Sequence, residues 1–135
     1  MTTKQAINPA GMAKPMGPYV QVTWAPPGAR MVFCSGAVAF GSDGSIVGVG
    51  DIVAQTRQTM ENLKMALEAA GATFADVMKI TNYVTDVTEY AKIAPVREEY
   101  LKEPYPASTM VEVKGLMFPE LMIEIEAIAL VHEAG

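Results

Sequence analysis

The sequence predicts an α+β fold in which two helices cover one face of a mixed β-sheet. The first observation is the order of its periodic segments, which reads β-β-(β)-α-β-α-β-β. The second is the length of 135 residues, which suits a single domain over residues 1–135. The third is the composition, 50% hydrophobic and 19% charged, which is typical of a folded core and excludes disorder.

The N-terminal part predicts two strands and little else. Residues 1–15 show no periodicity, so we expect them to lie as an arm on the surface. Residues 19–25 and 30–35 have strand-like composition, and the prolines and glycine at 26–28 predict a turn between them. These two strands are therefore expected to form a hairpin, followed by a glycine-rich loop up to residue 51.

The first helix has clear signals at both ends. Asp51 is a suitable N-cap, and Gly71 is placed as a C′ residue would be. An apolar stripe recurs at spacings of three and four residues: Ile52, Thr56, Met60, Leu63, Leu67 and Ala70. Gln55 and Gln58 are predicted to lie on the opposite, solvent-facing side.

The second half of the chain predicts a strand, a helix and two further strands. Their expected ranges are 77–85, then a helix from a cap at Thr88 to about residue 101, then 107–114 and 122–131. Pro104 and Pro106 exclude helix between the second helix and the next strand.

The last strand has two unlike faces. Its odd-numbered residues, from Leu121 to Val131, are all apolar and are expected to pack against the helices. The other face combines apolar residues with two carboxylates: Met122, Glu124, Glu126, Ile128 and Leu130. The preceding strand has a similar mixed face, with Ser108, Met110, Glu112 and Lys114. An uncovered, partly apolar sheet face predicts burial against another copy, with polar sites where the copies meet.

Composition excludes several classes of function. The net charge of −5 argues against nucleic acid as a partner, because that binding depends on neutralising phosphates. One cysteine, Cys34, excludes an internal disulfide, and with the one histidine it excludes the common metal sites, so we expect no metal. No leader-like segment or membrane-spanning apolar run is present, which predicts a cytoplasmic protein with no membrane partner.

The residues themselves suggest one place for chemistry. Glu124 and Glu126 point the same way from one strand, about 6–7 Å apart at the backbone. On a partly apolar face a carboxylate is desolvated, which raises its pKa and suits general acid–base work or the positioning of water. The structural alternative is that either carboxylate pairs with a cation or with amides across an interface. Ser35 and Gly36 end a strand, where a hydroxyl and free N–H groups face a ligand or simply a turn.

Five segments in this order resemble the Rid family (reactive intermediate deaminases, YjgF-like). They are 17–21 (GPYVQ), 32–36 (VFCSG), 50–71, 77–86 and 123–129 (IEIEAIA), so the resemblance covers nearly the whole chain. It implies a chorismate-mutase-like fold and a homotrimer whose three sheets form a central barrel. The ligand clefts of such a trimer lie between subunits.

The resemblance also implies an activity. Founding members of the family hydrolyse enamines and imines, such as 2-aminoacrylate, to a keto acid and ammonia without a cofactor. By resemblance, Glu124 would hold or activate the water, and Ser35 and Tyr19 would line the cleft. Backbone groups near Gly36, Ala37 and Met110 would meet the substrate.

The chain departs from the family pattern at two positions. Active deaminases have an arginine at the position of Ser108, which pairs with the substrate carboxylate, and often an asparagine at the position of Ala94. Losing a charge-assisted pair costs roughly 1.5–3 kcal/mol, about ten- to a hundred-fold in binding. This predicts a neutral or more apolar substrate, unless Arg30, Lys114 or Arg97 supplies the missing cation.

Two functions follow as alternatives. The first is an enzyme in which water attacks a C=N or enamine carbon while Glu124 transfers protons. The second is a binding module whose clefts hold a small ligand or a partner protein without turnover. A ribonuclease activity, sometimes linked with this family, is disfavoured by the acidic balance of charge.

Overall fold

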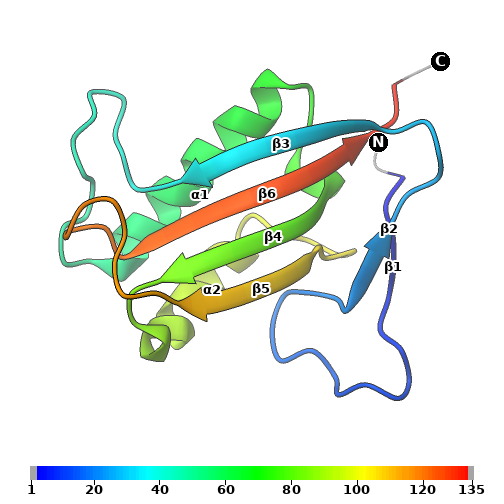
Figure 1. Ribbon diagram of the computed structural model, residues 1–135, viewed down its shortest axis with the longest axis horizontal. Helices are drawn as coiled ribbons and strands as arrows, with labels where there is room; N and C mark the ends of the chain where they lie inside the picture. The colour runs from blue at the N-terminus through cyan, green and yellow to red at the C-terminus, as the bar shows by residue number, and fades with distance from the viewer. Residues whose placement is uncertain (1–2, 134–135) are drawn as a thin grey trace.

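The computed structural model describes residues 3–133 and contains two sheets and two helices (Figure 1). The small sheet pairs β1 (Gln5–Ile7) with β2 (Val22–Trp24). The large sheet has the order β3 (Arg30–Ala37), β6 (Ile123–Val131), β4 (Val77–Val84) and β5 (Ala107–Glu112). The helices are α1 (Ile52–Ala69) and α2 (Tyr90–Glu98), and the 3-10 turns are η1 (Phe74–Asp76) and η2 (Val87–Glu89).

The large sheet is mixed, as predicted. Strands β4 and β5 run parallel, while β6 is antiparallel to both β3 and β4. Both helices lie behind the same face of this sheet in Figure 1. The predicted α+β class, with two helices on one face, is confirmed. The opposite face, which we call the open face, carries no helix in the described part of the chain.

The predicted hairpin between β2 and β3 is wrong. Strand β2 pairs with β1, and β3 pairs with β6 in the other sheet. The two prolines of the turn, Pro26 and Pro27, lack N–H donors, so a hairpin ladder cannot continue into this turn. The N-terminal arm therefore contains a strand, and Lys4 fixes it by donating from Nζ to the Val77 carbonyl over 3.0 Å.

Helix α1 begins and ends as predicted, but the exposure of Gln55 was predicted wrongly. Ala54 N donates to Asp51 Oδ1 over 3.1 Å, and Gly71 adopts a φ of +76° just beyond the helix. Gln55, predicted to face solvent, is fully buried. It donates to the Glu120 carbonyl and accepts from Met122 N, both over 2.8 Å, because α1 covers the chain that enters β6.

Helix α2 is shorter than predicted and has a different cap. Asp86, not Thr88, caps the turn that precedes it, accepting from Thr88 N over 3.0 Å. The reason is that η2 intervenes between strand and helix, so that α2 begins only at Tyr90. Its inward side buries Ile93, Val96 and Arg97.

The last strand divides its residues between core and open face as predicted. Ile123, Ile125, Ala127, Ala129 and Val131 are buried. On the open face, Met31 and Phe33 of β3 are 58% and 68% exposed, so apolar surface remains uncovered there. Within residues 3–133, no helix has the length and apolar character needed to cross a membrane.

Candidate functional site

The structure separates the predicted site residues into two groups. The β3–β6 group consists of Ser35, Gly36, Ala37 and Glu124, where the end of β3 meets β6. The β5–α2 group consists of Tyr19, Ala94, Ser108 and Met110, at the other side of the sheet. Each group has its own surroundings, and strand β4 lies between β6 and β5.

Glu124 lies over the backbone of β3. A β-bulge shifts the register between Cys34 and Ala37, and the carboxylate packs directly on Gly36 within this bulge. A Cβ atom at Gly36 would lie 2.0 Å from Glu124 Oε2, so only glycine permits this approach. Ser35 is exposed beside it. Glu124 is half-buried and makes no hydrogen bond or ion pair with residues 3–133.

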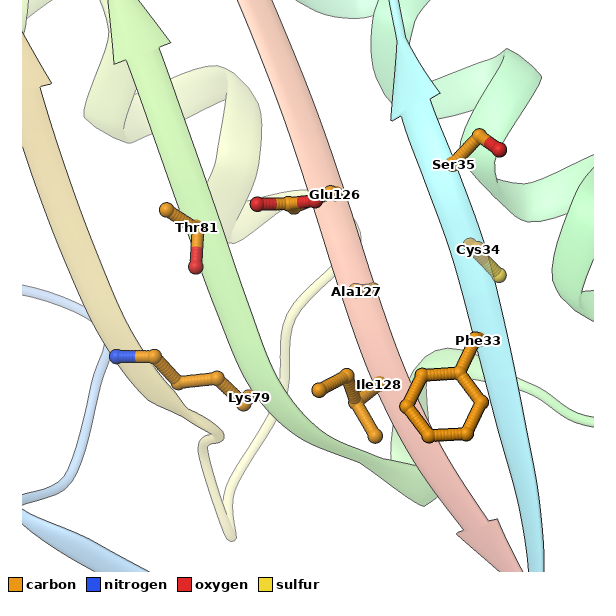
Figure 2. A pocket seen from close by; sticks show the side chains of 8 residues that line it. All are labelled: Phe33, Cys34, Ser35, Lys79, Thr81, Glu126, Ala127 and Ile128. Atoms are coloured by element: carbon orange, nitrogen blue, oxygen red, sulfur yellow. The ribbon is translucent and has the colours of Figure 1, made fainter.

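Glu126, the other carboxylate, has a partner. Tyr83 Oη donates to Glu126 Oε1 over 2.5 Å, and this hydrogen bond raises the pKa of the Tyr83 hydroxyl. Glu126 also lines a shallow cavity of about 290 Å³ on the open face, with Ser35, Lys79 and Thr81 (Figure 2). Glu126 is therefore engaged in a hydrogen bond within the chain, whereas the Glu124 carboxylate has no such partner among residues 3–133.

The open face around this cavity is apolar as well as polar. Phe33 pairs in register with Ile128, and Figure 2 shows their side chains next to each other. Lys79 Nζ donates to Thr109 Oγ1 over 2.6 Å, which joins β4 to β5 on the same face. A surface of this kind suits contact with another protein chain.

Three members of the β5–α2 group, Tyr19, Ser108 and Met110, line a second cavity of about 480 Å³, whereas Ala94 is not among its lining residues. Its lining residues are Met16, Tyr19, Gln21, Val87, Tyr90, Arg97, Ser108 and Met110. Tyr19 reaches this position because Val20 N donates to the Pro106 carbonyl over 3.0 Å, which fixes the segment beside β5.

The predicted shared face of Ser108 and Glu124 is wrong. Ser108 pairs in register with Ile80, which is fully buried, so its side chain points toward the helices. Asn82 Nδ2 donates to Ser108 Oγ over 3.2 Å, from the same buried side of β4. Glu124 pairs with Tyr83 and therefore points to the open face. Both faces of β5 combine polar and apolar residues, so alternation along this strand could not reveal which face meets the helices.

The three candidate cations lie in different places. Arg30 pairs with Glu133 and donates to the Ala70 carbonyl, and Lys114 is exposed beyond the end of β5. Arg97 is only 2% exposed, and its Nη2 donates to Ser108 Oγ over 3.3 Å. Burial lowers the pKa of the Arg97 guanidinium. Of the three, Arg97 contacts the serine.

Sequence reasoning missed Asn82. It is fully buried, and its Nδ2 also donates to the Thr109 carbonyl over 2.9 Å. The signal was present in the sequence, because Asn82 lies between Ile80 and Val84 on the buried side of the strand. A polar residue on an apolar strand face is rarely buried without a role.

Two further observations concern the cysteine and the metal-ligating residue types. Cys34 packs against the core, and burial raises the pKa of its thiol, which fits an unreactive cysteine. Within residues 3–133 no group of three or more His, Cys, Asp and Glu side chains is arranged to hold a metal ion.

Comparison with known proteins decides the family. The sequence profile of the family described as Endoribonuclease L-PSP matches residues 10–131. The structure of YyfB from Yersinia pestis, described as a protein of unknown function of the conserved Rid family, matches with a TM-score of 0.88. The two chains are 34% identical, and the match covers 96% of this chain and 100% of YyfB. The chain belongs to the Rid family.

Other Rid relatives cover similar lengths. A RutC family protein of Pyrococcus horikoshii is 40% identical over 126 residues, which are 93% of this Rid chain and 97% of the relative. The structure of TdcF from E. coli with bound serine matches with a TM-score of 0.68 and 33% identity. That match covers 93% of this chain and 98% of TdcF. These likenesses fix the family and the fold.

Proposed function

We propose that this Rid protein is a cofactor-independent hydrolase acting on an enamine, imine or similarly polarised bond. The observation that carries the proposal is the state of Glu124. Its carboxylate is half-buried, lies on the Gly36 backbone beside the exposed Ser35, and has no hydrogen-bond partner among residues 3–133. Such a carboxylate is free to accept a proton from water.

The proposed reaction needs only water and proton transfer. Glu124 removes a proton from water as the water oxygen forms a bond to the C=N carbon. The protonated carboxyl then gives this proton to nitrogen, which forms a carbinolamine. Glu124 next passes the hydroxyl proton to nitrogen as the C–N bond breaks, so that ammonia leaves, the carbonyl forms and the carboxylate is restored. For an enamine, protonation at carbon first yields the imine. The Ser35 hydroxyl and the backbone at Gly36, which lie beside Glu124, would orient the water and the substrate.

The proposed cleft lies between subunits of a homotrimer. The β3–β6 group and the β5–α2 group point away from opposite faces of one sheet, so a single chain cannot bring them together. An open face that exposes Met31 and Phe33 favours contact with another copy. The family resemblance implies the same arrangement, in which three sheets form a central barrel.

The alternative is a trimer that binds a small ligand or a partner protein without turnover. Ser108, at the position where the active deaminases have an arginine, favours it. The structure of TdcF with bound serine supports a small ligand under either reading. A ribonuclease function has less support, because the net charge of −5 opposes phosphate binding.

The change Glu124→Gln tests the proposal. Ammonia release from 2-iminobutanoate, generated in situ, should fall by about 10²-fold or more, since a general acid–base contributes roughly that much. Light scattering should report the same oligomer as for the unchanged protein. The matched control is Glu126→Gln, which should retain activity because that carboxylate is engaged with Tyr83.

One outcome would count against the role of Glu124, and another would count against the enzyme. Full activity in the Glu124→Gln variant would mean that another group transfers the proton. No ammonia release by the unchanged protein, from 2-iminobutanoate or from 2-aminoacrylate, would favour the binding module.

A further inference from the structure

Arg97 is a buried cation without an anion. Its side chain lies on the inward side of α2 and is 2% exposed. Within residues 3–133, Arg97 makes no ion pair, and its hydrogen bond goes to the neutral Ser108 hydroxyl over a long 3.3 Å. Its Nε is buried without a partner. Buried guanidinium groups are normally paired, because desolvating an unpaired charge is costly.

Neighbouring charges do not replace the missing anion. Glu98 is adjacent in the sequence and attracts the Arg97 guanidinium electrostatically, but it is exposed and makes no ion pair with it. Tyr90, which lines the same cavity as Arg97, carries no carboxylate. The position in the last turn of α2 gives some compensation, since a helix C-terminus favours a cation. The guanidinium still lacks a negatively charged partner within the described residues.

Arg97 also lines the 480 Å³ cavity, together with Tyr19 and Ser108. This volume lies within the range of small-molecule sites. Five of the eight lining residues are apolar or aromatic: Met16, Tyr19, Val87, Tyr90 and Met110. An anion in such surroundings meets a poorly solvated guanidinium, where electrostatic attraction is much stronger than in water.

We propose that Arg97 binds the carboxylate of the substrate in this cavity, so that the substrate is a small organic anion. The inference rests on the proposed function and adds the substrate class to it. Arg97 reaches the position from helix α2, whereas Ser108 lies on strand β5 and carries no charge. The substrate would then have a carboxylate next to the bond that Glu124 hydrolyses.

The charge of the site favours a carboxylate over a phosphate. Arg97 is the cation among the lining residues of the cavity, and one guanidinium balances one carboxylate. Its planar N–H groups match the two oxygens of a carboxylate. A phosphate dianion would need a second cation.

Binding measurements separate this proposal from the proposed hydrolysis. The probe is 2-oxobutanoate, a stable keto acid, and the neutral control is 2-oxobutanamide, with titration calorimetry as the readout. The unchanged protein should bind the keto acid at least about ten-fold more tightly than the amide. Arg97→Met should remove this preference, and Arg97→Lys should keep part of it. Arg57→Met, at an exposed arginine paired with Glu99, should keep all of it.

Stability serves as the second readout. Arg97→Met removes an unpaired buried charge, so the ligand-free variant should melt at or above the temperature of the unchanged protein. Three results would each overturn the proposal. They are equal binding of the keto acid and the amide, an undiminished preference for the keto acid in the Arg97→Met variant, and phosphate binding as tight as that of the keto acid. If the unchanged protein prefers 2-oxobutanoate to the amide but releases no ammonia, the carboxylate-binding role of Arg97 would be supported and the proposed hydrolase would be rejected.

Discussion

Ser108 and Arg97 are joined by a hydrogen bond in which a guanidinium donates to a hydroxyl instead of a carboxylate. The hydroxyl fixes the guanidinium without neutralising it, so the charge remains available for a ligand. Gly36 likewise leaves space for a charged group. Because it has no side chain, the Glu124 carboxylate can lie on the backbone of the strand. In both cases a small residue makes room for a charged one.

The contact between Ser108 and Arg97 predicts that Ser108→Arg alone destabilises the protein. The new guanidinium would lie beside the buried Arg97, and two like charges in a poorly solvated place should lower the free energy of unfolding by about 1–3 kcal/mol. Adding Arg97→Met should restore stability, and with it the preference for 2-oxobutanoate. Urea unfolding of the single and double variants checks this. A stable single variant with tighter keto acid binding would show that the two positions do not interact.

At the scale of elements, α1 holds the start of β6 in place. Gln55 supplies both a donor and an acceptor to the chain that enters this strand, at Glu120 and Met122. Strand β6 in turn carries Glu124. The position of the carboxylate therefore depends on a buried glutamine on the other side of the sheet.

Gln55→Met should weaken this connection at nearly constant volume. It leaves the Glu120 carbonyl and the Met122 N–H without their partners, so the free energy of unfolding should fall by about 1–3 kcal/mol. The matched control is Gln58→Met, which loses one hydrogen bond, to Asn62, and should fall by less than about 1 kcal/mol. Equal midpoints for the two variants in urea would contradict the role of Gln55.

Patterns among neighbouring residues predicted where helices and strands lie better than they predicted which of these elements contact each other. The cap at Asp51 and the stripe of α1 follow from neighbours in the sequence, and both are confirmed. The pairing of β2 with β1 depends on a distant segment, and so does the burial of Gln55; both were predicted wrongly. The same limit applied to the site. Glu124, Ser35 and Gly36 could be recognised together, but only the packing of α2 on β5 brings Arg97 to Ser108.

At the scale of the whole molecule, one chain carries the two groups of residues that the proposed cleft would combine, which we call half-sites. Glu124 faces outward on the open face, while Arg97 and Ser108 lie on the helix side of the sheet. The exposed Phe33 and Met31 lie near the first half-site on β3, where another copy would cover them. The proposed trimer would bring the half-sites of neighbouring chains into one cleft.

Complementation between two inactive variants tests this shared cleft directly. Glu124→Gln and Arg97→Met chains are co-expressed with different tags, mixed trimers are purified on both tags, and ammonia release is measured at low 2-iminobutanoate concentration. Each variant alone should be nearly inactive. With random assembly before selection, about one quarter of the clefts combine an intact Glu124 with an intact Arg97 from the neighbouring chain.

A shared cleft therefore predicts that mixed trimers regain a substantial share of the activity, at least about one quarter of that of the unchanged protein. Mixed trimers as inactive as either variant alone would contradict it, because Glu124 and Arg97 would then not act in one cleft across two chains.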